Sequence, residues 1–126
     1  LLRYDILYIF LEFIQHEERY IFFSSHITSD MQKIADYVIL IHQGKIIFEK
    51  SKDDLIYNYG IIRCGREKFT GISPDDYIIY REEKLSMECL VPDREAAKQK
   101  YKNVVVDSAS LEDIMLFYIK GGRGEK

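Results

Sequence analysis

The stretch that most constrains the fold is RYIFFSSHITSDMQKIADYVILI, which covers residues 19–41. Its apolar run over residues 21–23 has no polar alternation, and such runs are typical of parallel strands buried on both faces. Ser29 and Gln32 have the spacing of a capping box, which predicts a helix that begins directly after Ser29. The expected buried face of this helix consists of Met31, Ile34, Ala35 and Val38. A strand followed by a helix in this way indicates an α/β arrangement.

Two further patterns complete the first half of the chain. Residues 4–17 carry two apolar stripes at helical spacing, so they predict a helix that needs cover on two sides. Residues 38–41 and 46–49 flank a short turn in which Gly44 supplies a positive φ, and this pattern predicts a β-hairpin.

The remaining elements follow from caps and breakers. Ser51 is expected to cap a short helix through Tyr59, with Gly60 as its stop. The elements expected after it are strands over residues 61–64, 85–91 and 103–107, a turn or helix opened by Ser73, a helix over residues 93–102, and a helix capped by Ser110 with Leu111, Ile114, Met115 and Tyr118 on its apolar face.

The element order predicts an α/β core of helix, parallel strand, helix, hairpin and helix, followed by a small α+β segment. We expect the core to occupy residues 1–60, the α+β segment residues 61–120, and a disordered tail residues 121–126.

Composition excludes several classes of protein. The chain has 126 residues and a net charge of −3 with acids and bases interspersed, so it shows no global bias towards nucleic acid or an anionic membrane. Its apolar runs are far shorter than the ~20 residues of a membrane-spanning helix. Cys64 and Cys89 belong to no metal-binding motif, and we expect two reduced, partly buried thiols of a cytoplasmic protein.

His26 is the best candidate for a functional residue. It follows the C-terminal end of the predicted parallel strand, where α/β sheets place their ligand crevice. From the residue type alone, the alternative is a structural histidine whose ring N–H donates a hydrogen bond to a loop carbonyl. Ser25 and His26 are poorly placed to act as nucleophile and base, because neighbouring residues of a strand point to opposite faces. His16 and His42 are expected at the surface, and the three histidines lack metal-ligand spacing.

The segment YIFFSSHITSDMQKIADYVILIHQGKIIFEKS resembles the switch-histidine region of ABC transporter ATPase subunits. In that family a buried strand ends in a Ser-Ser-His or Thr-Ser-His triplet, here Ser24 to His26. A helix of the form (D/E)xxxxxD follows, matched by Asp30 and Asp36, and then a hairpin matched by residues 38–47. SKDDLIYNYG resembles the next helix of the family, and DSASLEDIMLFYI resembles its usual end.

The resemblance implies a partial P-loop NTPase-like core and a role in ATP hydrolysis that drives transport across a membrane. It identifies His26 as the switch histidine, which would contact the γ-phosphate of ATP and help to orient the attacking water. The residues 1–15 resemble the helix that follows the family's D-loop. The Walker A loop, the LSGGQ signature and the Walker B pair would then lie upstream, so we expect this segment alone to have no catalytic activity and no bound ATP or Mg²⁺.

The resemblance also implies partners and a location. In the family, ATP and Mg²⁺ bind the intact subunit, a second ATPase subunit forms a dimer, and a transmembrane permease is contacted at the cytoplasmic face of the membrane. Nucleic acid is not an expected partner.

Two alternatives remain at this stage. The first is a non-enzymatic domain that self-associates, because the apolar helix over residues 4–17 and the buried strand would expose apolar surface without further cover. The second is an unrelated hydrolase built on Ser25 and His26, which has little support.

Overall fold

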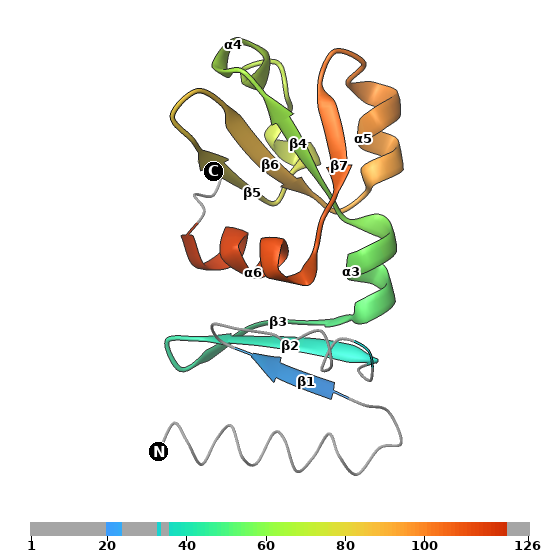
Figure 1. The fold of residues 1–126 in the computed structure, drawn as a ribbon, viewed down its shortest axis with the longest axis vertical. Helices are drawn as coiled ribbons and strands as arrows, with labels where there is room; N and C mark the ends of the chain where they lie inside the picture. The colour runs from blue at the N-terminus through green and yellow to red at the C-terminus, as the bar shows by residue number, and fades with distance from the viewer. Residues whose placement is uncertain (1–19, 24–32, 34–35, 121–126) are drawn as a thin grey trace. The chain divides into compact units, whose positions relative to one another are not determined.

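The computed structural model describes residues 20–23, 33 and 36–120 (Figure 1). The chain divides into two compact units, Leu1–Lys52 and Asp53–Lys126. This division lies N-terminal to the boundary expected after residue 60, so most of the helix assigned to the first domain belongs to the second unit. The assignment of residues 1–60 to an ATPase core, and of residues 61–120 to an appended segment, stays a prediction.

The first unit contains a mixed three-stranded sheet. Its strands are β1 (Tyr20–Phe23), β2 (Tyr37–His42) and β3 (Lys45–Ser51), in the order β1-β2-β3. β1 runs parallel to β2, as expected from its apolar sequence, and β2 runs antiparallel to β3. Side chains of Val38 to Leu40 are fully buried, which is typical of a central strand.

The hairpin between β2 and β3 has the predicted tight turn. Gln43 has φ 51° and Gly44 has φ 79°. Two consecutive residues with positive φ match the twist of the flanking strands, as in a type I′ turn. The role of Gly44 is therefore confirmed, whereas the left-handed conformation of Gln43 has no sequence signal.

One prediction in this unit is wrong and others lie outside the described residues. Val38 belongs to β2, where it pairs with Ile21 of β1, and not to the buried face of the preceding helix. The helices expected over residues 4–17 and after Ser29 fall largely outside the described part, as does the tail over residues 121–126.

The second unit is built on a fully antiparallel sheet in the order β5-β6-β4-β7. Its strands are β4 (Gly60–Cys64), β5 (Ile79–Glu82), β6 (Met87–Val91) and β7 (Val105–Ser108). Its helices are α3 (Lys52–Asn58), α4 (Arg66–Phe69), the 3-10 turn η1 (Pro74–Asp76), α5 (Arg94–Lys100) and α6 (Leu111–Lys120). The mixed α/β class is confirmed, and α4 and β5 are elements that the sequence patterns do not predict.

Both faces of this sheet are covered in part (Figure 1). On one face Ile62, Cys89 and Val91 pack with Ala97 of α5 and with Ile72 and Tyr77. On the other face Ile61, Leu90 and Ile79 occupy one row across three strands, and α6 packs against β5. Leu90 is therefore buried. The sequence alternates Met87, Cys89 and Val91 with Ser86, Glu88 and Leu90, and this pattern predicts Leu90 on the exposed side. In α6 the buried positions include Phe117, while Tyr118 is only partly buried.

Side-chain caps fix the helix starts where the sequence predicts them. The Asp93 carboxylate accepts from the Ala96 N–H at 3.1 Å, at the start of α5. Ser110 Oγ accepts from the Asp113 N–H at 3.0 Å, and the Asp113 carboxylate accepts from the Ser110 N–H at 3.2 Å. This reciprocal pair satisfies two free N–H groups at the start of α6.

Gly60 is not the helix stop that the sequence predicts. It is the first residue of β4 and has no positive φ. The absence of a side chain at Gly60 lets Asp107 and Arg94 lie close to its backbone. A Cβ at this position would lie 2.9 Å from the Asp107 carbonyl oxygen and 2.9 Å from Arg94 Cγ. Any larger residue would push β7 or Arg94 away from β4.

Candidate functional site

His26, the predicted catalytic residue, lies outside the described residues, and so does Ser25. The structure does describe the strand that leads to it. β1 ends at Phe23, which pairs with Leu40 in the parallel register. His26 follows the carboxyl end of β1 by three residues, and this is the end at which parallel sheets place ligands. The role of His26 stays a prediction.

The described residues around this sheet show no metal centre. His42 ends β2, is partly exposed and pairs with Lys45 across the hairpin. His16 lies outside the described part. Within the described ranges no group of three or more histidine, cysteine or acidic side chains is arranged to hold a metal ion. No helix of the described residues is long and apolar enough to cross a membrane.

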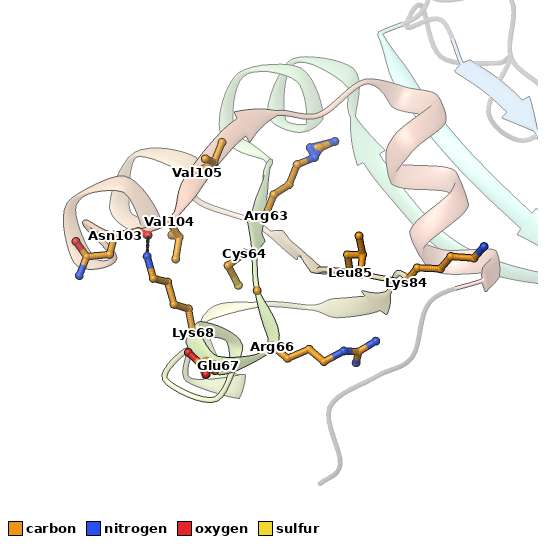
Figure 2. Close-up of a pocket in the computed structure, with 11 residues that line it drawn as sticks. Arg63, Cys64, Arg66, Glu67, Lys68, Lys84, Leu85, Asn103, Val104 and Val105 are labelled. Carbon is orange, nitrogen blue, oxygen red and sulfur yellow. Dashed lines mark hydrogen bonds between the residues drawn. The ribbon is translucent and has the colours of Figure 1, made fainter.

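The second unit has a cleft of about 570 Å³ at one end of its sheet (Figure 2). Its walls come from the end of β4, from α4, from the turn between β5 and β6, and from the segment before β7. A second cavity of about 310 Å³ adjoins it and shares Glu67, Lys68, Asn103 and Val104. We call the combined surface the basic groove, because its cationic lining residues are Arg63, Arg66, Lys68, Lys84, Lys100 and Lys102.

Ion pairs hold the arginines of the groove. Arg63 Nε lies 3.3 Å from Glu88 Oε2, and Arg63 Nη1 lies 3.3 Å from Asp107 Oδ2. Arg66 pairs with the Glu82 carboxylate and donates to the Glu83 carbonyl at 2.9 Å. These contacts fix the guanidinium groups in place and neutralise much of their charge.

The lysines of the groove are held differently. Lys68 donates to the Asn103 carbonyl oxygen at 2.7 Å, a bond drawn in Figure 2. A carbonyl oxygen carries no full charge, so the Lys68 ammonium keeps its positive field. Lys100 lies 2.8 Å from the Asp76 carboxylate. Hydrogen bonds from Lys100 and from the Tyr101 hydroxyl lower the pKa of Asp76. The hydrogen bond between Lys100 and Asp76 also raises the pKa of Lys100.

The two thiols of the second unit are not activated. Burial raises the pKa of Cys64, which lines the groove, although the nearby Lys68 acts in the opposite direction. Burial raises the pKa of Cys89 to about 12, so this thiol stays protonated at neutral pH. Both cysteines are free, as expected from the sequence. A nucleophilic role for either is therefore disfavoured.

Sequence patterns do not reveal the basic groove. Its cations come from segments around residues 63–68, 84 and 100–102, which are far apart in the sequence. Only the antiparallel pairing of β4 with β6 and β7 brings them to one end of the sheet.

Over 50 residues the chain is 44% identical to the ABC transporter ATP-binding protein NatA of Bacillus subtilis (strain 168). The match covers 37% of this chain and 20% of that relative, so the chain matches a fifth of the length of the relative. No protein-family profile matches the chain. No solved structure matches it significantly. The local identity supports a relationship to ABC transporter ATP-binding proteins.

Proposed function

We propose that the chain forms part of the ATP-binding subunit of an ABC transporter and that His26 contacts the γ-phosphate of ATP. The identity of 44% over 50 residues to an ABC transporter ATP-binding protein carries this proposal. The parallel pairing of β1 with β2 and the tight hairpin after it are consistent with a P-loop NTPase-like core.

The chemistry of phosphoryl transfer suits a histidine in this place. The reaction depends mainly on positioning and on stabilisation of charge at the transferred phosphoryl group. A neutral or protonated imidazole presents an N–H donor, which at hydrogen-bond distance from a γ-oxygen stabilises the charge that develops there. Mg²⁺ bound with the nucleotide supplies further neutralisation of the phosphates. We assign no described residue to the ion.

The remaining family properties are part of the same proposal. A second ATPase subunit and a transmembrane permease are the proposed partners, and the cytoplasmic face of the membrane is the proposed location. They rest on the match to NatA, an ABC transporter ATP-binding protein.

Steady-state ATP hydrolysis by the complete polypeptide that carries this sequence tests the proposal. We expect His26→Ala to lower turnover by about 100-fold, the usual effect of removing one donor to a developing oxyanion. His42→Ala is the matched control, because His42 lies beside the hairpin turn, is partly exposed and has no role in the proposed reaction. We expect its turnover to stay within about twofold of the parent protein.

Unchanged turnover in the His26→Ala variant contradicts the role given to His26. Absence of ATP hydrolysis in the complete parent polypeptide, with its membrane partner present, contradicts the proposed function as a whole.

A further inference from the structure

The basic groove carries a positive charge excess that the rest of the chain does not share. The chain as a whole has a net charge of −3, yet Glu67 is the one acidic residue, of those the structure describes, that lines either cavity. Carboxylates outside the lining neutralise Arg63, Arg66 and Lys100. Within the described ranges no carboxylate pairs with Lys68, Lys84 or Lys102. A concave surface with unneutralised lysines attracts anions.

The groove also exposes apolar side chains. Leu85 is 92% exposed and Val105 is 56% exposed, although both are large hydrophobic residues. They lie on two different walls of the cleft, Leu85 in the turn before β6 and Val105 at the start of β7 (Figure 2). Contact with these apolar side chains does not stabilise a bound inorganic anion. A polypeptide with acidic and apolar side chains is stabilised both by the lysines and by the apolar side chains of the groove.

The position of β7 favours an extended occupant. β7 is the edge strand of the described sheet, so its outer side offers backbone groups without a strand partner among the described residues. Asp107 and Ser108 of this strand are exposed residues. Extended peptides use such an edge together with side-chain pockets beside it.

We propose that the basic groove binds an extended acidic segment of a partner protein. Lys68, Lys84 and Lys102 attract its carboxylates, and its apolar side chains contact Leu85 and Val105. This surface belongs to the second unit and is separate from the role proposed for His26.

Binding of a labelled synthetic peptide that alternates glutamate with valine and leucine tests the proposal. We expect binding by fluorescence anisotropy that weakens as salt increases, because screening reduces the attraction between exposed charges. The double variant Lys84→Glu with Lys102→Glu should weaken binding by about tenfold, since it reverses two charges at the rim of the groove.

A matched double variant, Lys45→Glu with Lys98→Glu, controls for net charge. Both lysines are exposed and line neither cavity, so we expect the affinity of the parent protein. A peptide with glutamine in place of glutamate controls for the anionic groups and should not bind. An unchanged circular dichroism spectrum in both double variants excludes unfolding as the cause.

Several results would overturn the proposal. One is no binding of the acidic peptide, and another is equal weakening by the two double variants. A third is equal affinity for the glutamine peptide. A fourth is a groove-dependent signal that arises only with phosphatidylserine vesicles or an oligonucleotide. Each of these outcomes leaves the proposal on ATP hydrolysis unaffected, because that proposal depends on His26.

Discussion

Arg94 joins the end of α3 to the start of α5 and provides a quantitative test of the second unit. Its guanidinium donates to the Tyr57 carbonyl at 2.8 Å, to the Tyr59 carbonyl at 2.9 Å and to the Ile56 carbonyl at 3.4 Å. These carbonyls lie at the C-terminal end of α3, where a helix has no internal donors for them. Arg94 therefore caps α3 from a distant part of the sequence.

The Arg94→Met variant keeps the apolar stem and removes the donors. Hydrogen bonds to charged groups contribute ~1.5–3 kcal/mol when buried, and a cation at a helix C-terminus ~0.3–1 kcal/mol when exposed. Two of the three bonds are part-buried and one of these is long, so we expect a loss of about 2 kcal/mol in the free energy of unfolding. For a unit of this size, such a loss corresponds to roughly 10 °C in Tm.

Denaturant unfolding followed by circular dichroism measures this loss. Arg94→Lys should recover about half of it, because an ammonium keeps the charge but not the fork of donors. Lys98→Met on the same helix is the control, since its pair with Glu95 is exposed, and we expect less than about 0.5 kcal/mol. If Arg94→Met has the stability of the parent protein, the proposed cap does not stabilise α3.

Three further changes have expected outcomes. Gly60→Ala should lower the free energy of unfolding by about 1–3 kcal/mol, because the new Cβ meets the Asp107 carbonyl, while Gly65→Ala has open space and should lower it far less. Gln43→Asn should raise thermal stability slightly, because asparagine tolerates positive φ in a type I′ turn better than glutamine, and a lower Tm would contradict the turn assignment. Asp76→Asn should be less stable than the parent at neutral pH. The folded pKa of Asp76 is lowered, so its contribution is present above the unfolded pKa and is lost as pH falls through the folded value. The stability difference between the two proteins should therefore narrow in acid, and a difference that is constant with pH would refute the role of its hydrogen bonds.

Local signals predict much of the fold, because they depend on neighbouring residues. Gly44 fixes the hairpin, and Asp93 and Ser110 fix the starts of α5 and α6 through bonds within one turn. The apolar run of β1 is also a pattern of neighbouring residues, and it predicts the parallel pairing of this strand.

Contacts between distant residues account for the features that the sequence patterns miss. The sequence predicts that Gly60 ends a helix, because its contacts with Asp107 and Arg94 come from distant parts of the chain. The sequence pattern predicts an exposed Leu90, because the neighbours that bury it, Ile61 and Ile79, come from other strands of the folded sheet. The basic groove is missed in the same way, since three separate segments supply its cations. The role of His26 rests on resemblance and on its place after β1.

The distance between His26 and the γ-phosphate tests the central claim most directly. We expect a structure of the complete subunit with a non-hydrolysable ATP analogue and Mg²⁺ to place an imidazole nitrogen within about 2.7–3.2 Å of a γ-phosphate oxygen. An imidazole that faces away from the nucleotide and donates its N–H to a loop carbonyl instead would contradict the claim and leave His26 as a structural residue.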